Sequence, residues 1–444
     1  MKVAIIGGGI SGIATAFYIL KQEPQTKITI FEKMPQLGGK MKTKEVEGFF
    51  FEEGSNGFLS NKPDTLELIK LAGCEDILLR SDDNARIRYI YKEALHRLPE
   101  SAKAFIQTPL LSLKGKLRVA WEYFTPAKKD TSDETLQSFG YRRVGKEMTD
   151  VFLDAMVAGI FASTPDKISV LSAFPAVVKL EQEYGGLFRG MIAKKKKEAG
   201  PGGVLMSFEK GVSTFIQRLT QAMNAQIRTN TPVRKIEKKE GQYVLHVDDS
   251  QEYYDKVVLA TPAYESADMI VNLDEELAKD LKDIEYSPIS VVGLGYEELS
   301  HPLKGFGLLT TTCSKKDILG VLWDSSIFQD RVPFGKKALR VMIGGQRNPN
   351  LALKNDDELI QIAKKGVEQT MGIHEVPSVT YVKKYARGIP NYKVGHQIHM
   401  RNLFQRLQAH KGLFLSANAY FGVSLNDCVK NAKKVAYEVI KEGK

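Results

Sequence analysis

The sequence has few cysteines and no long hydrophobic run. Its three cysteines are far apart and form no Cys-x-x-Cys pair, which argues against a disulfide scaffold or a zinc ribbon and favours a reducing compartment. We interpret Cys74, Cys313 and Cys428 as small buried apolar residues. The apolar runs fall well short of the ~20 residues that a membrane-spanning helix requires, and the N-terminus lacks the apolar region of a signal peptide. These absences predict a cytoplasmic protein and leave open a peripheral attachment to the inner face of the cell membrane.

The composition is that of an ordinary globular protein with more than one domain. A chain of 444 residues exceeds what one simple core holds, so two or three domains are expected. The formal net charge of +10 suits an anionic ligand, an acidic membrane surface or a nucleic acid. No zinc-finger, RNP or helix-turn-helix pattern is present, so we expect no nucleic-acid partner, and we predict no metal site.

The first 33 residues carry a dinucleotide-binding pattern. Residues 2–6 (KVAII) are typical of a short buried strand, and apolar residues recur at helical spacing from Ile10 onward. A second strand is predicted over 27–31, and Glu32 follows Gly12 by 20 residues, the separation expected for the acid that binds a ribose hydroxyl. The glycines of the intervening GxGxxG permit a tight turn and let a pyrophosphate approach the backbone. The residues predicted to bind the cofactor here are Gly7, Gly8, Gly9, Ile10, Ser11, Gly12, Glu32 and Lys33.

A second glycine pair follows this pattern. Gly38 and Gly39 come six residues after Glu32, and residues 51–57 (FEEGSNG) add another turn that exposes backbone. This E-x5-GG-K spacing followed by an acid-glycine turn resembles the flavin amine oxidase superfamily, which includes monoamine oxidases, phytoene desaturases and protoporphyrinogen oxidases. The resemblance implies FAD rather than NAD as the cofactor. It implies further cofactor contacts at Gly39, Lys40, Gly54, Ser55, Asn56 and Gly57.

The C-terminal residues resemble another flavin-binding part of the same superfamily. We predict a strand over 412–415, a turn over 416–423 and a helix that begins near Ser424 or Asn426, both good N-caps. In the superfamily this helix points its N-terminus at the flavin pyrimidine edge, where its dipole favours the anionic reduced flavin by up to ~1–2 kcal/mol. The resemblance implies that Phe421, Gly422 and Val423 contact the flavin. It also implies an adenine contact at Val233 and a flavin contact at Tyr385, where some relatives have tryptophan.

A closer resemblance, to the protoporphyrinogen and coproporphyrinogen oxidases, covers nearly the whole chain. The residues that carry it are 54–73, 94–99, 142–175, 343–348, 389–396 and 422–429. It implies an α/β fold in three parts. An FAD-binding Rossmann-like domain would hold 1–80, 206–265 and 385–444, and a sheet-rich substrate domain would hold 266–384. A helical insertion over 95–205 would cover the active site and is a candidate for membrane contact.

The same resemblance implies a reaction and a set of substrate contacts. The reaction is the oxygen-using, six-electron oxidation of protoporphyrinogen IX to protoporphyrin IX in heme biosynthesis, in three cycles that each transfer a hydride to flavin N5. Pyrrole protons can leave to water, so we assign no side chain as a catalytic base. The implied contacts are Leu309, Leu322 and Met342 for the ring, Gly159 for the pyrrole groups, and His96, Arg97 and Lys103 for the propionates.

Several alternatives stay open at this stage. Coproporphyrinogen III carries four propionates instead of two, and the sequence does not show which charges face the pocket. Another flavin amine oxidase or a desaturase would keep the cofactor and change the substrate, whereas a binding protein would use the positive charge on lipid or nucleic acid. The run 194–197 (KKKK) predicts a solvated loop or, as a second interpretation, contact with anionic lipid at ~1 kcal/mol per basic residue.

Overall fold

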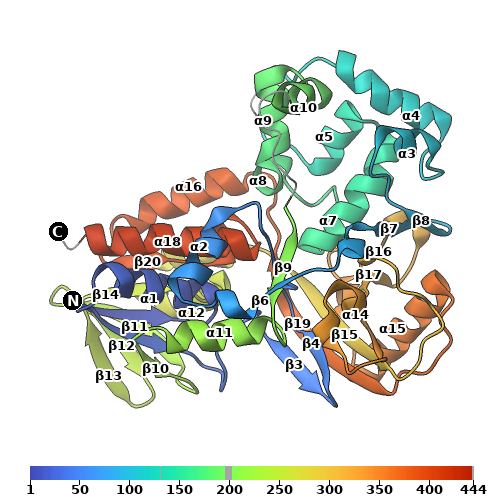
Figure 1. Ribbon diagram of the computed structural model, residues 1–444. Coiled ribbons are helices and arrows are strands. Elements are labelled where there is room, and N and C mark those ends of the chain that lie inside the picture. Colours follow the sequence, from blue (N-terminus) through green and yellow to red (C-terminus); the bar gives the residue numbers. More distant parts are fainter. Residues whose placement is uncertain (131, 196–202, 443–444) are drawn as a thin grey trace.

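The computed structural model describes residues 1–130, 132–195 and 203–442 (Figure 1). Its first lobe contains a parallel five-stranded sheet in the order β10-β2-β1-β14-β20. The strands are β1 (Lys2–Ile6), β2 (Lys27–Phe31), β10 (Gln226–Arg228), β14 (Lys256–Leu259) and β20 (Leu413–Leu415). Apart from the edge strand β10, they are short, mostly apolar runs because both faces of the sheet are covered. Of the lysine run at 194–197, Lys196 and Lys197 lie outside the described residues.

Alternate residues of β1 enter two different cores. Val3 and Ile5 face the helices α1 (Ile10–Gln22), α2 (Pro63–Leu71), α11 (Val212–Gln221) and α18 (Leu425–Lys441). Ala4 and Ile6 face a small antiparallel sheet and three helices. These elements are β11 (Val233–Lys239), β12 (Gln242–Val247), β13 (Ser250–Tyr254), α12 (Ala263–Ile270), α13 (Glu275–Lys282) and α16 (His396–Leu407).

Both ends of the chain belong to this lobe. The N-terminal helix α1 packs against the C-terminal helix α18, and the N- and C-termini lie on the same side of the molecule (Figure 1). The hydroxyls of Thr15 on α1 and Ser416 after β20 are hydrogen-bonded at 3.1 Å. The elements predicted at the two ends of the chain therefore pack together in one lobe.

A second, seven-stranded sheet has the order β19-β15-β18-β17-β16-β7-β8. One of its faces packs on helix α15 (Asp356–Met371), and the other faces α7 (Asp154–Phe161) and β4 (Phe49–Glu52). The strands in chain order are β7 (Arg88–Tyr91), β8 (Leu95–Arg97), β15 (Tyr286–Tyr296), β16 (Gly307–Thr310), β17 (Ile318–Leu322), β18 (Lys337–Gly344) and β19 (Val379–Pro390). Smaller pairings join β3 (Thr43–Val46) to β4, and β5 (Phe58–Leu59) and β6 (Leu78–Arg80) to β9 (Leu205–Phe208).

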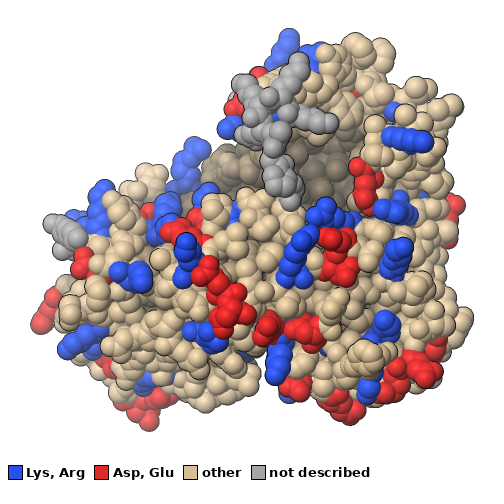
Figure 2. Space-filling view, viewed as in Figure 1, with Lys and Arg blue, Asp and Glu red and all other residues tan. Residues whose placement is uncertain are grey.

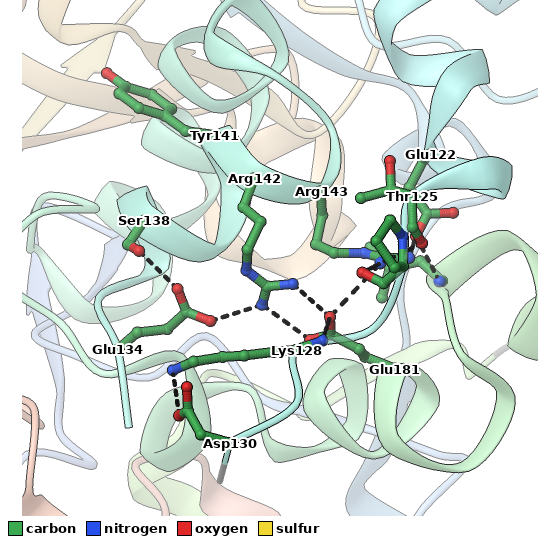
Figure 3. Close-up of polar contacts among 12 residues, drawn as sticks. Glu122, Thr125, Lys128, Asp130, Glu134, Ser138, Tyr141, Arg142, Arg143 and Glu181 are labelled. Carbon is green, nitrogen blue, oxygen red and sulfur yellow. Dashed lines mark hydrogen bonds and ion pairs between the residues drawn. The ribbon is translucent and has the colours of Figure 1, made fainter. Parts of the chain in front are cut away.

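A helical lobe stands above the second sheet (Figure 1). An ionic network links its helices: Arg143 is paired with Glu122, and Arg142 forms hydrogen bonds with both Glu181 and Glu134 (Figure 3). The side chains of Arg143 and Glu122 are fully buried, and charges this deeply buried are tolerated only when they are paired, so this pair constrains how the helices pack. The helices are α3 (Ala102–Gln107), α4 (Leu113–Ala120), α5 (Leu136–Arg143), α6 (Lys146–Met148), α7, α8 (Val170–Ala173), α9 (Pro175–Tyr184) and α10 (Leu187–Lys195).

The predicted α/β class, with a Rossmann-like lobe, a sheet-rich lobe and a helical lobe, is confirmed. Cys74 and Cys428 are buried as expected, but the prediction is wrong for Cys313, which is exposed. Cys313 lies in a short helical turn, Thr312–Ser314, that follows β16 at the surface. In the part of the chain that the structure describes, no helix combines the length and hydropathy needed to cross a membrane.

Candidate cofactor and substrate site

The first glycine turn leaves the N-terminus of α1 open. Gly9 is its N-cap, and no side chain of the described residues caps this helix end, so the N–H groups of its first turn are available to an anion. A Cβ at Gly12 would overlap the carbonyl oxygen of Gly7, so only glycine lets the helix start this close to the turn. The carboxylate of Glu32 lies at the same turn, where it accepts a hydrogen bond from Gly8 N at 2.9 Å.

The glycine doublet lies directly against this turn. Gly38 N donates to Gly8 O at 2.7 Å, and Gly39, with a φ of +60°, approaches Gly9 closely. Among the described residues, the nearest atom to a Cβ on Gly9 would be the Cα of Gly39 at 3.9 Å, so the space above Gly9 is open. Two backbone segments without side chains, 7–9 and 38–39, lie beside the uncapped N-terminus of α1. We call this arrangement the cofactor cradle, and it fits the pyrophosphate of a dinucleotide.

The third predicted turn, 54–57, joins the same cradle. A Cβ on Gly54 would lie 2.5 Å from the carbonyl oxygen of Lys40, so the turn packs on the residue that follows the doublet. The ammonium of Lys40 donates to Gly388 O and lies 6.0 Å from the centre of the Tyr385 ring. Burial lowers the pKa of Lys40 to about 8. The structure therefore places Lys40, whose ammonium loses its proton more easily than that of an exposed lysine, beside Tyr385, the predicted flavin contact.

The remaining predicted cofactor residues are spread around the first lobe. Val233 begins β11, which is held near Glu32 by a hydrogen bond from Thr231 N to Glu32 O at 2.9 Å. Lys33 is exposed and paired with Glu265 at 2.7 Å. Ser55 and Gly57 bond one another within the third turn. At the C-terminal end, Gly422 and Val423 lie between the short helix α17 (Asn418–Phe421) and α18, whose N-cap is Ser424. Phe421 is exposed and stacks on Phe404 of α16.

Strand register brings most predicted ring contacts onto one face of the second sheet. His96 pairs with Ile90, Ile90 with Leu309, Leu309 with Gly320, and Gly320 with Met342, so one row crosses five strands. Leu322 lies two residues along from Gly320 and shares that face. We call the face that carries Leu309, Leu322 and Met342 the ring face.

Helix α7 covers part of the ring face. A Cβ on Gly159 would lie 3.0 Å from the side chain of Leu309, so these two predicted contacts meet. Arg97, next to His96 in β8, points to the opposite face of the sheet and pairs with Glu100 at 2.9 Å. Lys103 is exposed on α3, outside the row. His96 is therefore the one of the three predicted propionate partners that shares the ring face.

Sequence reasoning missed a buried arginine that connects the ring face to the cofactor cradle. Arg340 lies two residues before Met342 in β18 and binds Asp324 through two hydrogen bonds of 3.0 and 2.9 Å. It also donates to Glu52 O at 2.6 Å and to the side chain of Asn56, in the third turn. The available signal was a charged residue inside the otherwise apolar run of β18.

A second unpredicted contact ties β19 to the same turn. Glu53 accepts hydrogen bonds from Tyr381 at 2.5 Å and Tyr385 at 3.4 Å, and it pairs with Lys383 at 3.2 Å. These three residues alternate along one side of β19, next to the ring face. The third turn is thus held from two strands of the second sheet.

Comparisons with known proteins show which family the chain belongs to. The family model for flavin containing amine oxidoreductases matches residues 10–440. The chain is 29% identical over 462 residues to coproporphyrinogen III oxidase of Bacillus subtilis, covering 99% of this chain and 97% of that protein. It is also 29% identical over 497 residues to protoporphyrinogen oxidase of Schizosaccharomyces pombe, covering 98% of each. A crystal structure from Exiguobacterium sp. 255-15, provisionally named protoporphyrinogen oxidase, superposes with a TM-score of 0.87 at 27% identity and covers 99% of both chains.

Proposed function

Because this chain belongs to the family of flavin-containing amine oxidoreductases, we propose that it is an FAD-dependent oxidase that converts protoporphyrinogen IX to protoporphyrin IX in heme biosynthesis. The likeness to porphyrinogen oxidases over the whole chain supports this substrate class. The observation that carries the proposal is the connection between the ring face and the cofactor cradle. Arg340 lies on the same face of the sheet as Met342 and binds the turn 54–57, so an apolar macrocycle on the ring face would lie next to the cofactor.

The chemistry requires positioning more than acid–base catalysis. When bound, FAD accepts two electrons in each cycle, so three cycles with three molecules of oxygen would remove six electrons and six protons and yield three molecules of hydrogen peroxide. The ring face and Gly159 would hold the macrocycle. His96 lies two strand spacings, about 10 Å, from Leu309. A propionate at the edge of a macrocycle bound over Leu309 could therefore contact His96. The space-filling view shows the molecule hollowed between the first lobe and the helical lobe, which supports entry of a large substrate (Figure 2).

Coproporphyrinogen III is the second candidate substrate. The relative from Bacillus subtilis, which matches at 29% identity, carries that name. This substrate would place carboxylates on all four pyrroles and would therefore need cationic partners at more than one edge of the ring face.

Parallel turnover of the two porphyrinogens tests the proposal. The purified protein should carry FAD, seen by its visible absorption, and should form fluorescent porphyrin from reduced substrate and oxygen. We expect kcat/KM for protoporphyrinogen IX to exceed that for coproporphyrinogen III at least about tenfold, a transition-state difference of ~1.4 kcal/mol. The reverse preference would assign coproporphyrinogen III. Oxidation of a polyamine by an FAD-loaded protein that is inert toward both porphyrinogens would overturn the proposal.

We also propose that the helical lobe contacts a membrane surface. Leu113, Leu117 and Trp121 follow one another at four-residue spacing along α4 and the turn after it, and Phe124 continues the stripe. Leu117, Trp121 and Phe124 are 63%, 62% and 64% exposed. Lys114 and Lys116 lie on the same helix. An exposed apolar stripe flanked by cations is typical of a helix that lies in the headgroup region of a bilayer.

Co-sedimentation with lipid vesicles measures this contact. The variant with both Leu117→Ser and Trp121→Ser should bind vesicles that contain anionic phosphatidylglycerol at least about tenfold more weakly than the wild type, because two large apolar side chains no longer insert. Leu353→Ser removes a side chain of similar exposure (56%) from another lobe and should bind as the wild type does. Equal binding by all three proteins would contradict the contact.

A further inference from the structure

The segment 389–396 (IPNYKVGH) runs from the end of β19 to the start of α16. It is anchored to the helical lobe by backbone and side-chain hydrogen bonds. Tyr392 O accepts from Ser169 N at 2.7 Å, and Gly395 N donates to Asp133 Oδ2 at 2.8 Å. Asn391 accepts from Ser163 Oγ at 2.8 Å. The backbone around Tyr392 is therefore fixed from the side of the helical lobe.

The side chain of Tyr392 extends toward the turn over 418–423. Its hydroxyl donates to Asn418 O at 2.6 Å and accepts from Gly422 N at 3.0 Å. These two atoms stand at the start of α17 and just after its end, so one hydroxyl closes the turn that leads into Val423. The N-cap of α17, Ala417, provides no capping side chain.

The ring of Tyr392 is held as firmly as its hydroxyl. It is 2% exposed, stacks on His396 with ring centres 4.3 Å apart, and packs against Phe161 of α7 at 5.7 Å. Burial lowers the pKa of His396 to about 4, so the stacked imidazole is neutral near pH 7. A buried ring between two neutral aromatic partners has one orientation, which fixes where the hydroxyl points.

We propose that Tyr392 is a positioning residue whose hydroxyl orients residues 418–423, and with them the N-terminus of α18, toward the flavin ring. The inference rests on the proposed contact of Phe421, Gly422 and Val423 with the flavin. A helix N-terminus aimed at the flavin stabilises the reduced, anionic form more than the oxidised form. Loosening the turn should therefore weaken the binding of FAD and lower the reduction potential of the bound flavin.

Tyr392→Phe in the full-length protein removes the hydroxyl and keeps the ring. The Kd of the apoprotein for FAD, measured by quenching of flavin fluorescence, should rise about tenfold, because Gly422 N and Asn418 O both lose their partner. The two-electron midpoint potential of the bound flavin should become more negative by about 30 mV, which corresponds to a tenfold loss of preference for reduced over oxidised FAD.

Tyr18→Phe is the matched control. Tyr18 is buried in α1 of the same lobe, and its hydroxyl has no hydrogen-bond partner among the described residues, so both readouts should stay at the wild-type values. If Tyr392→Phe does not fold, 3,5-difluorotyrosine at position 392, whose hydroxyl accepts more weakly from Gly422 N and donates more strongly to Asn418 O, should move the potential away from the wild-type value. A Tyr392→Phe or difluorotyrosine protein with wild-type potential and Kd overturns the inference. A wild-type protein that binds no FAD would instead overturn the proposed function.

Discussion

Replacing Gly9 with alanine should weaken FAD binding at least about 100-fold while the apoprotein stays as stable as the wild type. The backbone of Gly9 is extended, with a φ of −79° and a ψ of 173°, which alanine adopts without strain. The added methyl group would meet no described atom closer than 3.9 Å, so the apoprotein has room for it. The same methyl group would stand where the pyrophosphate approaches the backbone, and a 100-fold loss corresponds to ~2.8 kcal/mol of binding free energy.

Titration of the apoprotein with FAD, together with thermal unfolding, separates the two effects. Gly12→Ala is the contrasting variant: its Cβ would overlap Gly7 O, so this protein should lose stability as well as FAD binding. Unchanged FAD affinity in Gly9→Ala would mean that the cofactor does not cross Gly9, and the cradle would have to be placed elsewhere.

The sequence predicts the N-terminal part of the first lobe well because its signals are local. The strand over 2–6, the helix from Ile10 and the strand over 27–31 all lie where periodicity predicts them. Gly12 and Glu32 both contact the first glycine turn, because all three belong to one strand-turn-helix-strand unit. Each of these features depends on residues within about 30 positions of one another, which is the range that a sequence pattern covers.

The second sheet could not be predicted in the same way. Its row from His96 to Met342 depends on the parallel pairing of β7 with β16, strands more than 200 residues apart. Alternation along β8 predicts that His96 and Arg97 face opposite sides, but only the register with β7 decides which of them joins Leu309. The resemblance supplied the candidates, and the register selects His96 among them.

Buried charge was the other weak point of sequence reasoning. Arg340 and Arg143 are nearly inaccessible, and their partners lie 16 to 288 residues away, as the contacts of Arg340 with Asp324 and Glu52 show. A charged residue in an apolar run indicates that it is buried with a partner, but the sequence of the run does not identify that partner. Tyr392 has the same character, because its hydroxyl serves a turn that begins 26 residues later.

Replacing Arg340 with methionine should lower the free energy of unfolding by about 3–5 kcal/mol. Arg340 and Asp324 are 1% and 3% exposed at their side chains, so the variant leaves a carboxylate buried without its cation. Glu52 O and the amide of Asn56 lose a donor at the same time. Arg340→Lys should recover only part of the loss, because an ammonium cannot reproduce the two-pronged contact with Asp324.

Urea unfolding followed by tryptophan fluorescence measures the effect of Arg340→Met. Of the two tryptophans, Trp323 is buried beside Asp324 and reports directly on the second sheet. Arg80→Met, which breaks an exposed pair with Asp83, is the control and should cost less than about 1 kcal/mol. A loss of stability in Arg340→Met as small as that of the control would mean that the Arg340 guanidinium does not stabilise the fold. A large loss of stability together with weaker FAD binding would show that Arg340, which lies on the ring face, also holds the turn 54–57 against the cofactor.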